Sequence, residues 1–347
     1  MAACRFIPPL LLLAVLAAAC APSEPETSTS APAPTVDSSD VFVRVNQLGY
    51  RTDDAKVAIA VSHQSTDGTF SVVDAATDTT VYQGPVEDDS AGTWGTFGHY
   101  DRLDFSGVTT PGRYYVTVDA TGDRSPTFRV GPDAYGTVQD TLLAFMRQQR
   151  CGYNPFLDVV CHQRDGRTFG GPMPDSTFVD AIGGWHDAGD QLKYLLTASN
   201  ATARMLLAYE QEPDKFGDAV DAWGRTFPND VPDVLDEARW GLRWLYKLHP
   251  EPDQLFHQVA DDRDHIGWKW PQHDSSDYGW GADSYRPLYY ATGEPQGLGE
   301  YKSEATGIGN LAGRYAAAMA MAAQVWRERG NARDAERALA AAVEVYE

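Results

Sequence analysis

The first part of the chain alternates apolar and polar residues in short runs, which is the pattern of half-buried β-strands. Clusters rich in Gly, Pro, Asp and Thr separate the runs and indicate turns. About seven short strands with regular turns predict a β-sandwich over residues 41–131. The expected strands lie at 41–45, 56–61, 70–73, 80–82, 103–105, 114–118 and 127–130.

From residue 132 onward, apolar residues recur at the spacing of amphipathic helices. Gly330 is expected to end the fourth helix, and Asn331 with Asp334 to cap the fifth. No strand of convincing length is expected among the helices. The long loops at 151–189 and 249–308 are where functional residues are expected. The expected helices lie at 133–150, 190–210, 230–248, 309–329 and 331–346.

The N-terminal segment has the composition of an export signal. Residues 1–20 combine Arg5 with an apolar run that is too short to span a bilayer. The small residues before Cys20 resemble a bacterial lipoprotein cleavage site, which would leave Cys20 lipid-anchored; ordinary signal cleavage is the alternative. Residues 21–40 are rich in Ser, Thr, Pro and Ala, which predicts a flexible linker. We therefore expect an exported protein, either lipid-anchored at the bacterial cell envelope or extracellular.

The formal net charge of the chain is −21 at pH 7. Such a surface repels nucleic-acid phosphates and anionic membranes, so we expect no nucleic-acid partner and no membrane contact beyond the lipid anchor. A neutral polysaccharide meets no such repulsion. Acidity that only keeps an exported protein soluble explains the charge equally well. We expect the chain to be a monomer.

Two carboxylates, Asp187 and Asp190, lie three residues apart in a glycine-flanked segment that begins at Gly183. Glycine on both sides favours a tight turn with close backbone approach. Glycoside hydrolysis needs a carboxylate base that activates water and a separate acid that protonates the leaving oxygen. Two carboxylates this close in sequence would share the water. In the alternative interpretation, Asp190 only caps the following helix and Asp187 only stabilises the turn.

Two cysteines and two histidines lie in or beside one loop: Cys151, Cys161, His162 and His186. Two sulfurs and two imidazoles form a set that suits tetrahedral zinc. Such a zinc would be structural, because four protein ligands leave no open position for water. A disulfide between the two cysteines is the default for an exported protein, and spacing alone slightly favours it.

The loop at 257–290 places aromatic rings beside acidic and histidine side chains. Rings that stack on the C–H faces of pyranoses, with polar groups nearby, suit a sugar-binding cleft. The acids of the loop would alternatively bind calcium, or the loop is a solvated acidic segment anchored by buried rings. Its acids and histidines are His257, Asp261, Asp262, Asp264, His265, His273, Asp274 and Asp277. Our candidates for substrate binding are Trp185, Trp268, Trp270 and Arg286.

These motifs together resemble glycoside hydrolase family 9. The segment 183–190 resembles the catalytic-base motif of the family. Residues 43–50 resemble the opening of the immunoglobulin-like domain that precedes the barrel in many members. The segments at 229–238, 286–293 and 313–318 are similar to further family segments, and the match runs in order from about residue 41 onward.

The resemblance implies an immunoglobulin-like β-sandwich followed by an (α/α)6 barrel at 132–347. It implies inverting hydrolysis of cellulose-like β-glucans or their oligosaccharides, with Asp190 as general base and Asp187 helping to hold the water. Some members bind zinc through two cysteines and two histidines, so the resemblance favours zinc over a disulfide. Calcium also occurs in such members, but the resemblance assigns no calcium ligands here.

Two departures from the family pattern matter. Gln191 stands where many members have histidine, which puts one substrate contact in doubt. The general acid of the family is a glutamate near the end of the barrel, after a histidine motif and an aspartate motif, and none of these is present. We therefore expect a truncated barrel that lacks its proton donor and is inactive alone. The alternatives to an enzyme are a non-catalytic carbohydrate-binding surface lipoprotein and a purely structural one.

Overall fold

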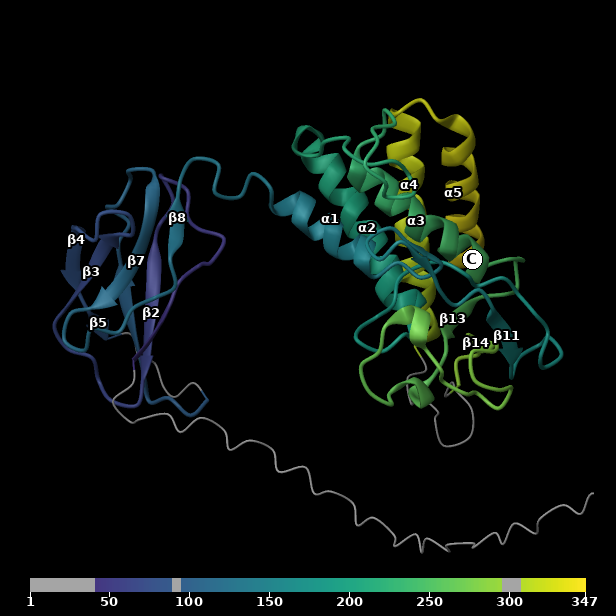
Figure 1. Ribbon diagram of the computed structural model, residues 1–347. Coiled ribbons are helices and arrows are strands. Elements are labelled where there is room, and N and C mark those ends of the chain that lie inside the picture. The colour runs from purple at the N-terminus through teal and green to yellow at the C-terminus, as the bar shows by residue number, and fades with distance from the viewer. Residues whose placement is uncertain (1–40, 89–94, 295–306) are drawn as a thin grey trace, which may run out of the picture. The chain divides into compact units, whose positions relative to one another are not determined.

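The computed structural model describes residues 41–88, 95–294 and 307–347. The chain divides into two compact units, residues 1–132 and 133–347 (Figure 1). The export signal and the linker expected at 1–20 and 21–40 lie outside the described residues. Within the described ranges, no helix combines the length and the apolar character that a membrane span requires.

The first unit contains two antiparallel four-stranded sheets, ordered β1–β2–β6–β5 and β4–β3–β7–β8 (Figure 1). Every expected strand overlaps an observed one. The two-residue strand β5 was not predicted, because two residues are too few to show alternation. The bounds are β1 Val41–Arg44, β2 Val57–Ser62, β3 Thr69–Asp74, β4 Thr80–Pro85, β5 Glu87–Asp88, β6 His99–Asp104, β7 Gly112–Val118 and β8 Phe128–Val130.

Aromatic rings fill the centre of the sandwich. Tyr50 packs edge-on against Phe105 and Phe128, with ring centroids 5.2 and 5.4 Å away. The Tyr50 hydroxyl donates a hydrogen bond to the Val57 carbonyl at 2.8 Å, so its polar end is satisfied inside the core.

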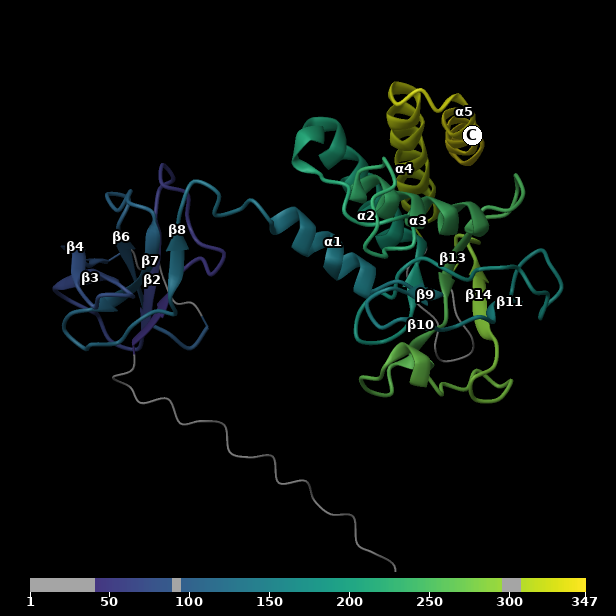
Figure 2. The same cartoon turned by 45° about the horizontal axis from the view of Figure 1, so that its top comes forward.

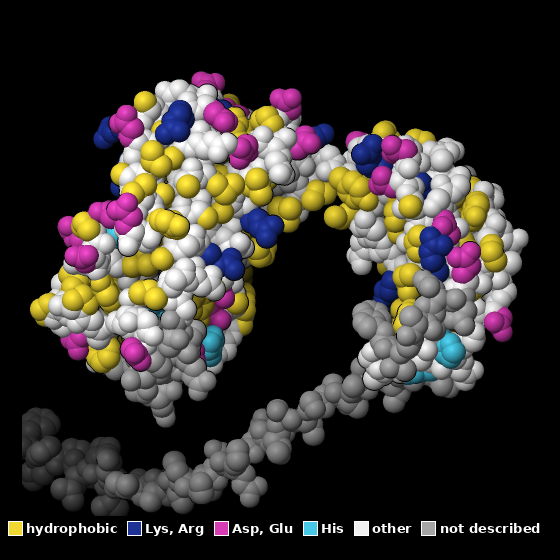
Figure 3. Space-filling view, turned by 180° about the vertical axis from the view of Figure 1, so that it is seen from behind, with side chains coloured by type: hydrophobic (Ala, Val, Ile, Leu, Met, Phe, Trp, Pro, Cys, Tyr) yellow, Lys and Arg dark blue, Asp and Glu magenta, His cyan; other side chains and the backbone are white. Residues whose placement is uncertain are grey.

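Acidic side chains are scattered over the face of each unit that Figure 3 shows, rather than gathered in one patch. This distribution agrees with a role of the net charge in solubility.

The second unit contains all five expected helices among its described residues. Helix α2 packs against α3 and α4, and α4 packs against α5 (Figure 2). The predicted cap of α5 is confirmed, because the Asn331 side chain accepts a hydrogen bond from the Asp334 N–H at 3.2 Å. The bounds are α1 Val138–Gln148, α2 Leu195–Gln211, α3 Asp233–Leu248, α4 Ile308–Glu328 and α5 Ala332–Tyr346.

A small four-stranded sheet, ordered β11–β14–β13–β12, corrects the expectation that no strands interrupt the helices. Its strands have two to five residues and come from distant parts of the chain, so no local hairpin pattern reveals them. The chain also forms the short hairpin of β9 and β10. The bounds are β9 Tyr153–Asn154, β10 Val159–Val160, β11 Asp165–Phe169, β12 Lys193–Tyr194, β13 Phe256–Val259 and β14 Arg286–Tyr290.

The start of α2 is also corrected. The helix was expected from residue 190, but β12 intervenes and α2 begins at Leu195. Its N-cap position is Tyr194. Asp190 therefore does not cap α2, and the interpretation of Asp190 as a mere helix cap is wrong.

Candidate active site and metal centre

The four predicted metal ligands come together, with their ligand atoms all within 4.8 Å of one another: Cys151, Cys161, His162 and His186. His162 Nδ1 lies 3.3 Å from His186 Nε2, and Cys161 Sγ lies 3.8 Å from the same nitrogen. Bonds of about 2.05 Å to nitrogen and 2.3 Å to sulfur place the ligands of a tetrahedral zinc about 3.3–3.8 Å apart. Both cysteines are free thiols, so the disulfide is not formed. The two distances to His186 Nε2 fall in this range, so the cluster has a size that suits a four-coordinate metal ion.

The two cysteines of the cluster have pKa values shifted in opposite directions. Burial alone would raise the pKa of the Cys151 thiol, but the hydrogen bond from Cys161 and the charge of Lys193 lower it well below its ordinary value. The hydrogen bond to Cys151 and burial raise the pKa of Cys161. A cysteine binds a metal ion through its thiolate, so any proton that either sulfur carries is released when the ion binds.

The ring of His162 is oriented by a carboxylate. His162 Nε2 lies 3.0 Å from Asp274 Oδ2, which leaves Nδ1 to face the cluster. Burial would raise the pKa of Asp274, but hydrogen bonds from His162, Lys269 and Ser276 lower it. Asp274 is therefore an anion that accepts the Nε2 proton of His162, an arrangement that fixes the tautomer of metal-binding histidines.

Arg286 was predicted to bind substrate, and the structure corrects this. The residue is 3% exposed and donates two hydrogen bonds to Asp165, at 2.7 and 2.8 Å. Lys193 Nζ lies 2.7 Å from Oδ2 of the same carboxylate. Burial raises the pKa of Asp165, but the two cations lower it. The guanidinium is buried beside Cys151. Arg286 therefore supports the cluster of cysteines and histidines and does not reach a bound substrate.

Trp185 is corrected in the same way. Its side chain is buried at 5% exposure, and its Nε1 donates a hydrogen bond to Glu237 Oε1 at 2.8 Å. A ring that is packed in the core and bonded at its only polar atom cannot stack on a sugar. The motif alone does not reveal this, because a tryptophan beside glycines suits both a buried turn and a binding surface.

Helix α3 positions the segment that leads into the site. Trp244 Nε1 donates to the Ala181 carbonyl and Trp240 Nε1 to the Gly184 carbonyl, each at 2.9 Å. One turn further along, Lys247 Nζ donates to the Ile182 carbonyl at 2.7 Å. These three donors lie on one face of the helix, because they are spaced by three and four residues. The segment therefore runs tightly along α3.

That close approach requires glycine. The backbone of Gly184 has a φ of 72°, and a Cβ there would lie 2.6 Å from the Trp244 ring. An L-residue would be strained in this conformation and would also clash with the ring.

The Asp187–Asp190 turn is anchored just beyond each end. On one side, His186 belongs to the metal cluster. On the other, the Gln191 N–H donates to Asp264 Oδ2 at 2.7 Å, and Arg286 donates to the Gln191 carbonyl at 2.6 Å. The turn is thus held rigidly by groups that are themselves buried.

The two aspartates of the turn have different surroundings. Asp187 is exposed on the wall of a cleft. Asp190 is largely covered: its Oδ1 accepts a hydrogen bond from the Leu192 N–H at 3.2 Å, and its Oδ2 lies 3.1 Å from His265 Nε2. The sequence marked His265 only as a loop residue, with no signal that it pairs with Asp190.

The cleft beside Asp187 has a volume of about 490 Å³. Trp268 and Trp270, which were predicted to bind substrate, both line it and are 69% and 46% exposed. Their rings meet edge to face, with centroids 5.0 Å apart. A Cβ at Gly189 would lie 2.8 Å from Trp268 Cδ1, so glycine leaves room for the ring. The cleft thus combines a carboxylate with exposed aromatic faces, as a sugar-binding site requires.

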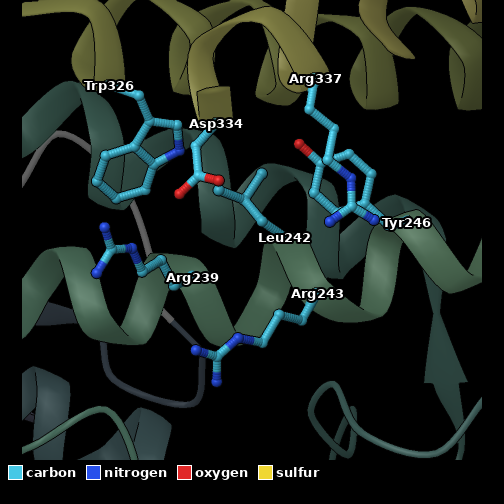
Figure 4. Close-up of a pocket in the computed structure, with 7 residues that line it drawn as sticks. All are labelled: Arg239, Leu242, Arg243, Tyr246, Trp326, Asp334 and Arg337. Atoms are coloured by element: carbon cyan, nitrogen blue, oxygen red, sulfur yellow. The ribbon is translucent and has the colours of Figure 1, made fainter. Parts of the chain in front are cut away.

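A second pocket, of about 380 Å³, is lined by side chains of α3, α4 and α5 and offers no comparable chemistry (Figure 4). Its one carboxylate, Asp334, already accepts a hydrogen bond from Asn331 at 2.7 Å. Arg337 lies over the Tyr246 ring, 3.8 Å from its centroid. The pocket is lined by Arg239, Leu242, Arg243, Tyr246, Trp326, Asp334 and Arg337.

Comparison with known proteins gives two family matches. The model of glycosyl hydrolase family 9 matches residues 135–347, and that of the cellulase N-terminal ig-like domain matches residues 39–123. Endoglucanase C of Cellulomonas fimi is 31% identical over 259 residues, which cover 65% of this chain and 22% of that protein. A xyloglucan-specific endo-beta-1,4-glucanase of Bacteroides ovatus is 27% identical over 272 residues, covering 74% of this chain and 43% of that protein.

Solved structures give the same result. A metagenome-derived family 9 endoglucanase is 29% identical with a TM-score of 0.68, covering 88% of this chain and 54% of that one. A Zn-binding triple mutant of the family 9 endoglucanase J30 is 25% identical with a TM-score of 0.61, covering 85% and 52%. The chain thus spans between about a fifth and about half of the length of these four proteins.

Proposed function

Because this chain belongs to glycosyl hydrolase family 9, with a cellulase-type immunoglobulin-like domain before the family domain, we propose that it acts on β-glucans of the cellulose type or their oligosaccharides. The two family models confirm the predicted family and the predicted order of the two folds. The observation that carries the proposed function is the cleft that Asp187 lines together with the exposed rings of Trp268 and Trp270.

The proposed reaction is an inverting hydrolysis. Asp190 acts as the general base, and Asp187 holds the water from the wall of the cleft. Among the described residues that line the cleft, Asp187 is the one carboxylate, and Asp190 belongs to the same turn. We therefore propose that the general acid, which must come from a different part of the protein, lies outside the described residues. An inverting pair is separated by about 6.5–9.5 Å to admit the water, so the acid would stand across the cleft from the turn.

We propose that the cluster of two cysteines and two histidines binds a structural zinc ion. Its interatomic distances support this assignment, as does the Zn-binding variant of a structurally similar endoglucanase. When bound, the ion would cross-link the chain at both ends of the loop between Cys151 and His186. We assign no calcium ligands, because within the described ranges no second cluster of three or more His, Cys, Asp or Glu side chains forms.

The location of the protein stays a prediction. We propose export with a lipid anchor at Cys20, a monomeric state, and a neutral glycan rather than a nucleic acid as ligand. Incorporation of a radiolabelled fatty acid by the wild-type chain but not by a Cys20→Ala variant would test the anchor.

A substrate with a reactive leaving group tests the proposed function without the general acid. The dinitrophenolate of 2,4-dinitrophenyl β-cellobioside departs without protonation, so a base and a held water suffice to release it. We expect the chain to bind cellohexaose and to release dinitrophenolate, but to cleave cellohexaose far more slowly. Binding without any release would favour a non-catalytic carbohydrate-binding protein, and absence of both would contradict the proposal.

Trp268→Ala is expected to weaken cellohexaose binding about tenfold, which corresponds to a loss of about 1.4 kcal/mol in binding free energy. The physical reason is the loss of an exposed ring that lines the cleft. Isothermal titration calorimetry measures the change. The matched control is Ile266→Ala, which removes another exposed apolar side chain from the same loop but not from the cleft. Equal affinity in both variants would exclude Trp268 from the binding surface.

A further inference from the structure

One buried carboxylate on α3 contacts the two residues that directly precede the first and the last metal ligand along the chain. Glu237 Oε1 accepts a hydrogen bond from Trp185 Nε1 at 2.8 Å, and Trp185 directly precedes His186. The same carboxylate accepts two hydrogen bonds from Arg150, at 3.2 and 2.7 Å, and Arg150 directly precedes Cys151. The two bonded side chains come from segments 35 residues apart (185 − 150) that carry the first and last ligands of the cluster.

We propose that Glu237 is a positioning residue that holds Cys151 and His186 at the spacing a zinc ion requires. Through His186 it also sets the entry of the turn that carries Asp187 and Asp190. The inference rests on the proposed metal site. It assigns to α3 an indirect part in metal binding, since no residue of α3 belongs to the ligand cluster.

The backbone around this contact supports the assignment. Arg150 and Trp185 face each other in an antiparallel bridge. Next to the bridge, the His186 N–H donates to the Gln149 carbonyl at 2.8 Å. The two segments are therefore paired side by side, and Glu237 binds both side chains of the central pair. A shift of either side chain would be transmitted to the adjacent ligand, because only one peptide bond separates them.

The contact is shielded from water, so its two charged groups are held to each other. The side chains of Glu237 and Arg150 are 0% and 1% exposed. The guanidinium of Arg150 also lies over the Trp240 ring, 4.4 Å from its centroid. A charged pair in such surroundings has no alternative partner in solvent. If either side chain moved away, the charge of the other would stay buried and unpaired.

Glu237→Gln tests the inference through the metal rather than through catalysis. The amide keeps an oxygen for Trp185 but loses the negative charge that binds Arg150. We expect zinc release to a chromogenic chelator to become about tenfold faster, within the range for residues that support metal ligands. With Co²⁺ in place of zinc, we expect the thiolate and d–d absorption bands to shift, because they report ligand geometry.

The matched control is Asp236→Asn, a change at the adjacent buried acid of the same helix. Its carboxylate accepts a hydrogen bond from Asn229 at 2.8 Å, and its ion pair is with Arg239 of the same helix rather than with a described residue of the metal loop. We expect wild-type zinc release and a wild-type Co²⁺ spectrum for this variant. A general effect of removing a buried charge from α3 would change the zinc release rate and the Co²⁺ spectrum of both variants alike. A positioning role changes them only in Glu237→Gln.

Trp185→Phe is the milder second variant, because it keeps a ring in the core and removes only the Nε1–H donor. We expect zinc release to become about threefold faster, a smaller effect than that of Glu237→Gln, because the contact between Glu237 and Arg150 remains. Release rates and Co²⁺ spectra that match Asp236→Asn in both variants would overturn the inference. A wild-type chain that takes up no zinc would overturn it together with the metal site. A chain that holds zinc as expected but neither binds nor cleaves glucans would contradict the proposed function alone.

Discussion

Replacing Asp190 with asparagine is expected to slow release of dinitrophenolate from 2,4-dinitrophenyl β-cellobioside by about 10²–10⁴-fold, the usual contribution of a general base. Asparagine has nearly the shape of aspartate and keeps an oxygen for the Leu192 N–H, so the turn is preserved. It cannot accept a proton from the attacking water. The loss should therefore appear in kcat, with little change in cellohexaose affinity.

The control for Asp190→Asn is Asp214→Asn, which changes an exposed aspartate in the short turn Pro213–Lys215. We expect wild-type release for this variant. Asp187→Asn should also slow release, because the water would lose its second partner. If Asp190→Asn kept more than about a tenth of the wild-type rate, the assignment of the base would be wrong.

Replacing Cys151 with serine is expected to abolish zinc binding and to lower the thermal stability of the second unit. A site that zinc fills at about 1,000 times its dissociation constant contributes about 4 kcal/mol to the folded state. At roughly 2–4 °C per kcal/mol for a unit of this size, the transition should fall by about 8–16 °C. Serine offers no thiolate, and three remaining ligands cannot complete the tetrahedral set.

Scanning calorimetry with and without a chelator measures the effect of Cys151→Ser. The chelator should lower the transition of the wild-type chain but leave that of the variant unchanged, because the variant has no ion to lose. The unfolding of the β-sandwich serves as an internal reference and should not move. If the chelator left the transition temperature of the wild-type chain unchanged, a stabilising metal at this cluster would be excluded.

The helices were predictable because their signals are local. The apolar period and the cap formed by Asn331 and Asp334 lie within one or two helical turns, and the structure shows the helices that they predict. The small sheet was not predictable, because β11 and β14 pair across more than a hundred residues and are only five residues long. Pairing of this kind is decided by tertiary packing rather than by propensity.

The same contrast applies to the tryptophans that were predicted to bind substrate. Trp185 and Trp268 are both tryptophans beside glycine in acidic segments, yet one is buried against Glu237 and the other lines the cleft. The type of the side chain could not decide between these outcomes. Burial depends on what packs against the ring, and for Trp185 that partner lies 52 residues further along the chain.

The sequence by itself determined which chemical groups are available and where they are close along the chain. It identified the paired aspartates, the two cysteines and two histidines, and the family to which their order belongs. Only the tertiary structure brought the four ligands within reach of one ion, with both thiols free. It also recruited Arg286 and Glu237 as supports, because a buried charge takes its partner from whatever element the fold packs against it, at any sequence separation.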